Sequence, residues 1–305
     1  MQANLRGIRI LVLGGDQREI EMVRCLAELE GQIYTVGHMP YPGYANVTRA
    51  ESLGNIPEAL PEVDVIVAPV SHTDQSGQLI AVPEKGVTIR IDDQLLQRFP
   101  ARTPLFIGKA RPVIRELAER HKIQLIETAE DDEIAILNSI PTAEGAIQIA
   151  MEELPITLHE SKAIVLGFGR CGVTLARTLQ ALGAHVCVIA RNPAQLARAK
   201  EMGLDTAFLS ALGERVKTAD VVFNTVPTLL LTEEILQQMR IGTLVVDIAS
   251  APGGVDYAVA ADLGLRAILA LGLPGKVAPI TAGRILGQCL PRKILKALPR
   301  NDPPA

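Results

Sequence analysis

The sequence contains no tryptophan, and aromatic residues make up only 3% of its 305 residues. Aromatic platforms that stack on the bases of single-stranded nucleic acid are therefore not expected. A basic excess is also missing, because 34 Asp and Glu residues outnumber 30 Lys and Arg residues and the formal net charge is −4. Nucleic-acid binding requires a basic surface that displaces counterions, so both features argue against a nucleic-acid partner.

Cysteine is sparse, and no two cysteines are spaced as a Cys-x-x-Cys pair. The four residues are Cys25, Cys171, Cys187 and Cys289. Zinc knuckles and dithiol redox motifs need such pairs, so we expect neither, and the sequence predicts no metal site. Four thiols in a chain of this length are typical of a reducing compartment.

Long hydrophobic runs are absent as well. The apolar stretch at residues 258–273 is broken by Asp262 and Arg266, so it is not expected to span a bilayer. Residues 1–7 do not have the layout of a signal peptide. We therefore expect a cytoplasmic protein that acts on a small molecule and has no membrane partner.

The sequence does contain short apolar runs that alternate with helical patterns, which is typical of α/β proteins with parallel sheets. The predicted strands cover residues 8–13, 33–36, 63–67, 87–91, 105–107 and 124–126, then 163–166, 185–189, 221–224, 244–247 and 267–271. The predicted helices cover residues 19–30, 112–122, 171–182, 194–202 and 280–297. The second series of strands resembles a full dinucleotide-binding domain, and the first resembles a smaller relative of it.

These two series predict two domains. We place a substrate domain with linker helices at residues 1–154 and an NADP-binding domain at 155–283, with a C-terminal helix and tail at 284–305 packing back on the first domain. The helical pattern at residues 131–154 contains Pro141, which lacks an N–H and clashes with the preceding turn. We therefore predict one helix to about Asn138 and another from Thr142 to Glu153.

A glycine motif joins the first strand of the second series to its helix. Gly167, Gly169 and Gly172 fit the pattern Gly-x-Gly-x-x-Gly. In dinucleotide-binding units the first glycine permits a tight turn, the second admits the pyrophosphate and the third lets the helix pack closely. The intervening residues, also predicted to border the cofactor, are Phe168, Arg170 and Cys171. For Cys171 we favour a small residue packed beneath the pyrophosphate.

The next strand ends at Arg191 and Asn192 rather than at Asp or Glu. An acid at this position would bind the ribose 2′-hydroxyl of NAD, whereas a guanidinium suits the 2′-phosphate of NADP. The sequence therefore favours NADP, with NAD as second choice. A solvated surface arginine is the alternative.

Two later strands end in polar loops, which we also consider as cofactor contacts. Their residues are Asn224, Thr225, Val226 and Pro227 after one strand, and Asp247 and Ser250 after the next. Ligands of doubly wound sheets lie outside the carboxyl ends of the strands, which favours this role. Ordinary turn formation accounts for the same residue types equally well.

Four segments together carry a family resemblance: residues 14–18, 138–145, 167–172 and 272–283. In order and spacing they resemble the family of dipicolinate synthase A-subunits over nearly the whole chain. The resemblance implies an α/β fold of two Rossmann-like parallel-sheet domains with the active-site cleft between them. This layout is similar to that of 2-hydroxyacid and alanine dehydrogenases.

The resemblance also implies an activity. The family oxidises dihydrodipicolinate to dipicolinate (pyridine-2,6-dicarboxylate), the calcium-chelating acid made in the mother cell of spore-forming bacteria. The A-subunit is the implied nicotinamide-dependent dehydrogenase, and a flavoprotein-like B-subunit is its implied partner. We also expect a homo-oligomer.

Such a substrate is a planar dianion, which cations would bind. Arg18, after the Gly14-Gly15 turn, is the first choice for a substrate carboxylate, and a surface arginine is an equal alternative. Asp16 is a further candidate, although capping the following helix is its favoured single role. Lys276 would attract the dianion or a cofactor phosphate, unless it is a mobile surface lysine.

The reaction also needs a base, for which His72 and Glu144 are candidates. Imidazole titrates near neutrality, and burial would raise the pKa of a carboxyl group. An exposed loop histidine and a first-turn acid favoured by the helix dipole are the alternatives. Polar contacts to the substrate are predicted from four further residues: Ser71, Asn138, Ser139 and Thr142.

Two other functions fit the same sequence. One is a different two-domain dehydrogenase that acts on a hydroxy or amino acid. The other is a nucleotide-binding protein that has no chemistry of its own and serves a flavoprotein partner.

Overall fold

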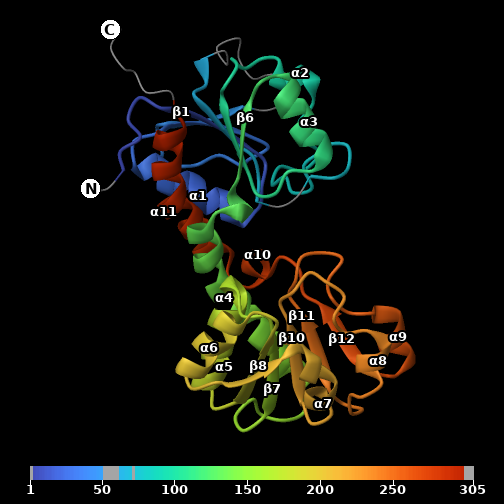
Figure 1. Cartoon of the computed structure of the whole chain (residues 1–305). Helices are drawn as coiled ribbons and strands as arrows, with labels where there is room; N and C mark the ends of the chain where they lie inside the picture. The colour runs from blue at the N-terminus through green and yellow to red at the C-terminus, as the bar shows by residue number, and fades with distance from the viewer. Residues whose placement is uncertain (1–2, 51–61, 71–72, 299–305) are drawn as a thin grey trace. The chain divides into compact units, whose positions relative to one another are not determined.

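The computed structural model describes residues 3–50, 62–70 and 73–298 (Figure 1). The chain divides into two compact units. Unit 1 comprises residues 1–135 and 279–305, and unit 2 comprises residues 136–278. The division thus falls within helix α4 (Asp132–Glu153), whereas the sequence placed the domain boundary after residue 154.

Unit 1 contains a parallel sheet of six strands in the order β3-β2-β1-β4-β5-β6. The strands are β1 (Arg9–Leu13), β2 (Gln32–Val36), β3 (Val47–Ala50), β4 (Val65–Val67), β5 (Pro104–Ile107) and β6 (Gln124–Glu127). In register, Ile10 of β1 lies opposite Ile33 on one side and Val65 on the other. The chain order reverses between β1 and β4, the position at which open α/β sheets form ligand sites.

Among its described residues, unit 1 contains four helices and the start of α4. They are α1 (Gln17–Glu28), α2 (Asp93–Leu96), α3 (Pro112–Arg120) and α11 (Pro279–Ala297). The C-terminal helix α11 lies directly against α1, because Gly283 and Gly287 have no side chains to hold the two apart. A Cβ at residue 283 would lie 2.5 Å from the Arg18 carbonyl oxygen, and one at residue 287 would clash with Cys25.

Unit 2 repeats the same topology with the order β12-β11-β10-β7-β8-β9. Its strands are β7 (Lys162–Leu166), β8 (His185–Ala190), β9 (Asp205–Phe208), β10 (Val221–Asn224), β11 (Leu244–Asp247) and β12 (Arg266–Leu269). Its helices are α5 (Arg170–Ala181), α6 (Pro193–Glu201), α7 (Leu212–Val216), α8 (Glu233–Leu236), α9 (Tyr257–Asp262) and α10 (Leu273–Val277). The strands named in both sheets pair in parallel, so the predicted fold class is confirmed for both units.

The central strands are buried on both faces. The residues of β1 from Ile10 to Leu13 are fully buried, and so are Val221, Val222 and Phe223 of β10. Burial on two faces explains why these strands are continuous apolar runs rather than alternating ones.

Helix α4 continues through Pro141, so the prediction of two helices was wrong. Proline removes one hydrogen bond from a helix and leaves carbonyl groups nearby without their usual donors. The carbonyl that loses its donor is that of Leu137, four residues before Pro141. On either side of it, Ser139 Oγ donates to the Ile136 carbonyl at 2.6 Å and Thr142 Oγ1 donates to the Asn138 carbonyl at 2.7 Å. Thr142 therefore lies within the helix and does not begin a second one.

The edges of the sheets also differ from the prediction. Residues 87–91 form no strand and contribute only the isolated bridge between Gln78 and Arg90. The edge strands β3 and β9 were missed, because half of the residues in each of these four-residue segments are polar and neither segment contains an apolar run.

Candidate functional site

The turn after β7 opens a cavity at the carboxyl end of the sheet of unit 2. Gly167 has φ +88°, and a Cβ there would lie 2.6 Å from Thr225 Oγ1. At Gly172 a Cβ would clash with the Gly167 carbonyl oxygen, so the helix needs this glycine to pack on the turn. Gly169 is the N-cap of α5 and makes no side-chain cap, and a Cβ there would meet nothing within 4 Å. The three glycines thus have the steric properties that a dinucleotide-binding turn requires.

The cavity has a volume of about 280 Å³. Seven predicted cofactor residues line it: Gly167, Phe168, Gly169, Arg191, Thr225, Val226 and Pro227. Six others were not predicted: Ile189, Ala190, Gln195, Leu209, Thr228 and Leu230. Of the thirteen described lining residues, Arg191 is the only charged one, and it is exposed. The exposed first turn of α5 and this single cation fit the phosphates of a nicotinamide dinucleotide.

Several predicted cofactor residues have a structural role instead. Asn192 is the N-cap of α6, and its Oδ1 accepts a hydrogen bond from Ala194 N at 2.9 Å. Cys171 is half-buried at the start of α5, and burial raises the pKa of its thiol, so it is a packing residue rather than a thiolate. Three others are also outside the cavity lining: Arg170, Gly172 and Ser250.

Asn224 and Asp247 are fully buried, and their side chains bond to groups within the protein. Asn224 bonds both to the Val226 backbone and to Asp247. The Asp247 carboxylate accepts four hydrogen bonds, including one from the hydroxyl of Tyr257. Their predicted direct contact with the cofactor is therefore corrected: they hold the loops that surround it.

In unit 1 the turn after β1 places Asp16 and Arg18 together. Asp16 is the N-cap of α1, as its favoured role predicted, and its Oδ1 accepts from Arg18 N at 2.9 Å. The guanidinium of Arg18 donates to the same carboxylate, with Nη2 2.7 Å from Oδ2. Burial alone would raise the pKa of the Asp16 carboxyl, but the hydrogen bonds from Arg18 lower it below its usual value. The side chain of Arg18 is only 12% exposed, so it is not the surface arginine of the alternative interpretation.

Two buried titratable residues, both missed by the sequence analysis, hold this turn. Glu19 Oε2 accepts from Asp16 N and Oε1 accepts from Val70 N, which ties the turn to the segment after β4. Burial raises the pKa of Glu19. His38 Nε2 donates to the Gly14 carbonyl at 2.7 Å, so its Nδ1 accepts from the Tyr41 hydroxyl. Burial lowers the pKa of His38 to about 4 and keeps the ring neutral.

The predicted substrate residues on α4 have different surroundings. Ser139 is fully buried, and its Oγ lies 2.5 Å from Thr174 Oγ1, so a direct contact with substrate is not supported. Glu144 is exposed in the middle of the helix, which removes both the desolvation and the first-turn position that its two interpretations assumed. Asn138 is partly exposed, and its backbone carbonyl accepts a hydrogen bond from the Thr142 hydroxyl.

Three predicted residues remain. Lys276 is exposed on α10. Ser71 and His72 lie outside the described residues.

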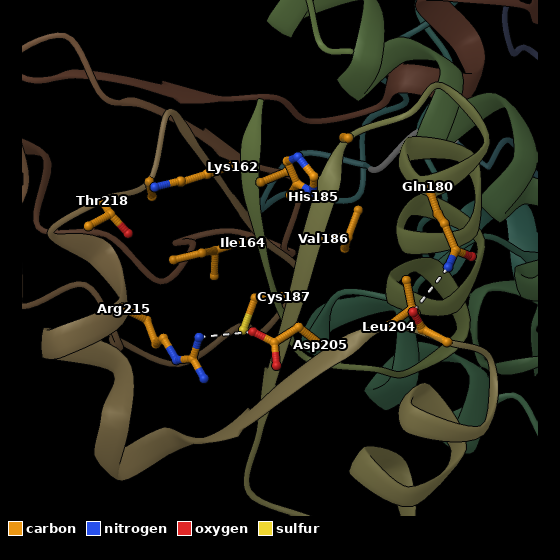
Figure 2. Close-up of a pocket in the computed structure, with 14 residues that line it drawn as sticks. Lys162, Ile164, Gln180, His185, Val186, Cys187, Leu204, Asp205, Arg215 and Thr218 are labelled. Carbon is orange, nitrogen blue, oxygen red and sulfur yellow. Dashed lines mark hydrogen bonds and ion pairs between the residues drawn. The ribbon is translucent and has the colours of Figure 1, made fainter. Parts of the chain in front are cut away.

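A second cavity of unit 2, of about 470 Å³, lies at the opposite, amino-terminal end of the strands (Figure 2). Lys162, His185 and Asp205 begin β7, β8 and β9 at its border. Figure 2 shows the ion pair between Arg215 and Asp205, 2.9 Å long, beside Cys187. Burial raises the pKa of the Cys187 thiol to about 11, so it is not a nucleophile near neutral pH. Because ligands of parallel sheets bind at the carboxyl ends, we assign this cavity no part in nucleotide binding.

Comparison with known proteins agrees with this geometry. Residues 9–129 match the N-terminal domain of the dipicolinate synthase A-subunit, and residues 138–260 match the alanine dehydrogenase/PNT C-terminal domain. The chain is 41% identical over 287 residues to the dipicolinate synthase A-subunit of Bacillus subtilis (strain 168), covering 94% of this chain and 95% of that protein. The chain belongs to the family of dipicolinate synthase A-subunits.

Solved structures support the same assignment. The crystal structure of the dipicolinate synthase A-subunit from Bacillus halodurans matches with a TM-score of 0.90 and 35% identity, covering 95% of this chain and 99% of that one. An L-alanine dehydrogenase matches with a TM-score of 0.62 and 16% identity over 94% and 91% of the two chains, which shows a shared fold. The family resemblance found in the sequence is therefore confirmed.

Membership of this family, together with the dehydrogenase-type second domain, makes the chain an NAD(P)-dependent oxidoreductase. Within residues 3–50, 62–70 and 73–298, no helix is both long and apolar enough to cross a bilayer.

Proposed function

We propose that this protein oxidises dihydrodipicolinate to dipicolinate by transferring a hydride to NADP. The observation that carries the proposal is the cavity over the Gly167–Gly172 turn, in which Arg191 is the only described charged residue. The name of the Bacillus subtilis relative, a dipicolinate synthase, supports the choice of substrate.

The residues of unit 2 would hold the cofactor through phosphate contacts. The N–H groups at the start of α5 have no side-chain cap, so they are available to the pyrophosphate beside Gly169. Arg191 would bind the 2′-phosphate that distinguishes NADP from NAD. When bound, the nicotinamide ring supplies the hydride acceptor, and the protein supplies binding, orientation and electrostatics.

The residues of unit 1 would bind the substrate at the carboxyl end of its sheet. Arg18 Nε and Nη2 already bond to Asp16, and Nη1 has no hydrogen-bond partner among the described residues. This remaining donor would bind one substrate carboxylate. Oxidation removes a hydride and a proton from the ring, and we propose that His72 takes the proton, because imidazole is the side chain whose ordinary pKa lies near neutrality. The gain of pyridine aromaticity leaves positioning as the main task of the protein.

We also propose a flavoprotein-like B-subunit as partner, because the names of the related proteins identify them as A-subunits of a synthase. A cytoplasmic location in the mother cell and a homo-oligomeric state belong to the same proposal.

The test is to mix the purified chain alone with NADP and freshly generated dihydrodipicolinate and to follow absorbance at 340 nm. A rise that depends on the substrate supports the proposal. A rise that occurs only when the B-subunit is added would make this chain a non-catalytic nucleotide-binding protein. A rise with hydroxy or amino acids but not with dihydrodipicolinate would assign the site to a different dehydrogenase reaction.

A further inference from the structure

A buried polar network lies behind one wall of the nucleotide cavity, and its outermost member is a tyrosine. Asp247, at the end of β11, is fully buried. Its Oδ1 accepts from Asn224 Nδ2 at 2.9 Å and from Ala249 N at 3.0 Å. Its Oδ2 accepts from Gly254 N at 2.7 Å and from the Tyr257 hydroxyl at 2.8 Å. A buried carboxylate with four donors has a fixed orientation, because the loss of any one donor leaves part of the charge unsatisfied.

Two of these donors connect Asp247 to the loop of residues 225–230, which supplies Thr225, Val226, Pro227, Thr228 and Leu230 to the cavity lining. Asn224 Nδ2 donates to the Val226 carbonyl at 3.0 Å, and its Oδ1 accepts from Val226 N at 3.1 Å. The side chain of Asn224 thus holds the loop by the backbone of Val226.

Gly254 makes the second connection. Its carbonyl accepts from Leu230 N and Leu231 N, both at 3.0 Å. A Cβ at residue 254 would lie 2.5 Å from Asn224 Nδ2 and 2.6 Å from the Thr228 carbonyl oxygen, so the two loops touch through backbone. The loop is consequently held near its start by Asn224 and at its end by Gly254, and Asp247 holds both.

We propose that Asp247 and Tyr257 are positioning residues of the nucleotide site. Tyr257 orients the Asp247 carboxylate, and the carboxylate fixes the wall formed by residues 225–230 through Asn224 and Gly254. The wall follows β10, on the other side of the β7–β10 reversal from Arg191 at the end of β8. Because its residues are uncharged and line the same cavity as Arg191, the wall would contact the part of the dinucleotide that NAD and NADP share. This inference rests on the proposed nucleotide site.

The test is the Tyr257→Phe variant, which keeps the ring and removes one hydrogen-bond donor. We expect the dissociation constants of NADPH and NADH to rise together by about 2- to 10-fold, with the ratio between them unchanged. Tyr44→Phe is the matched control, since the Tyr44 hydroxyl also donates to a carboxylate, Glu28 Oε1 at 3.2 Å, but in unit 1. It should leave both constants unchanged.

Amide hydrogen exchange tests the wall without any nucleotide. We expect faster exchange at Val226, Leu230 and Leu231 in Tyr257→Phe than in the wild type and in Tyr44→Phe. Unchanged exchange together with unchanged dissociation constants overturns the inference, and so does a loss of affinity confined to NADPH. If the proposed nucleotide site is wrong, the result is different, because Gly169→Val then binds NADPH as the wild type does. The exchange data still decide whether Tyr257 holds the wall of residues 225–230.

Discussion

The Arg18 guanidinium forms a two-point contact with the Asp16 carboxylate, with Nε 2.9 Å from Oδ1 and Nη2 2.7 Å from Oδ2. The same carboxylate caps helix α1, so the arginine is oriented by the element that carries it. An arginine held in this way loses little side-chain freedom when it donates once more, to a substrate carboxylate.

Arg18→Ala should therefore lower kcat/KM for the dicarboxylate. The loss of transition-state stabilisation should be about 1.5–3 kcal/mol, the usual value of a charge-assisted hydrogen bond. The affinity for NADP should not change, because Arg18 lies in unit 1 and the Gly167–Gly172 turn lies in unit 2. Steady-state kinetics and a cofactor titration measure both. Arg24→Ala, which removes an exposed arginine paired with Glu21 on the same helix, is the control and should have no effect on kcat/KM. Equal losses in the two variants would remove Arg18 from the substrate site.

Arg191 should determine the choice between NADP and NAD. Arg191→Asp replaces a donor to the 2′-phosphate with a repelling charge, so the preference for NADP should disappear. Calorimetric titration with both cofactors measures this directly. Arg198→Asp is the control, because it makes the same change of charge in the helix after Arg191. Arg198 pairs with Glu201 and lies outside the cavity lining, so this variant should keep the preference for NADP. An NADP affinity that is the same for Arg191→Asp and the wild type would contradict the assignment.

Two glycines of the Gly167–Gly172 turn should respond differently to substitution, one in nucleotide binding and the other in folding stability. Gly169→Val should abolish nucleotide binding with little effect on stability, because a Cβ there meets no protein atom within 4 Å. Gly172→Ala should instead lower the free energy of unfolding by about 1–3 kcal/mol, since its Cβ would clash with the Gly167 carbonyl. Urea denaturation and nucleotide titration of both variants separate the two effects. A folded Gly169→Val variant with wild-type affinity would make the turn purely structural.

His38 should give the protein a characteristic loss of stability in acid. Burial lowers its pKa to about 4 in the folded state, below the ordinary value of 6.5. The unfolded chain therefore binds the proton first as the pH falls, and stability is lost between pH 6.5 and about 4. The full shift corresponds to about 3 kcal/mol.

Urea denaturation of the wild type and of His38→Gln across this range isolates the effect of the imidazole, since the carboxylates titrate equally in both proteins. The stability advantage of the wild type should shrink as the pH falls. A difference that is independent of pH would mean that His38 is not held neutral.

The glycine turn after β7 could be predicted from sequence because its determinants are local. The glycine spacing, the strand before it and the helix after it all lie within one short segment, and Gly167, Gly169 and Gly172 each have the expected steric role. Arg191 was found for the same reason, since it directly follows the next strand.

Other features depended on contacts between distant segments. Asn224 and Asp247 were expected to face a cofactor, but their partners across the β10–β11 pair make them internal supports. Helix α4 was expected to break at Pro141 but continues through it, and the hydroxyls of Ser139 and Thr142 that bond to neighbouring carbonyls are ordinary polar residues in the sequence. Glu19 and His38 gave no signal, because their importance comes from burial against the Gly14–Asp16 turn.

In the proposed reaction this chain itself moves a hydride from dihydrodipicolinate to the nicotinamide ring. Substrate that carries deuterium at both saturated ring carbons, incubated with NADP and the purified chain, tests this transfer by mass spectrometry of the reduced cofactor. We expect NADPH with a single deuterium at C4 of the nicotinamide, together with dipicolinate in equal amount. Dipicolinate formed only with the B-subunit, and without deuterium in the NADPH, would contradict the proposed transfer.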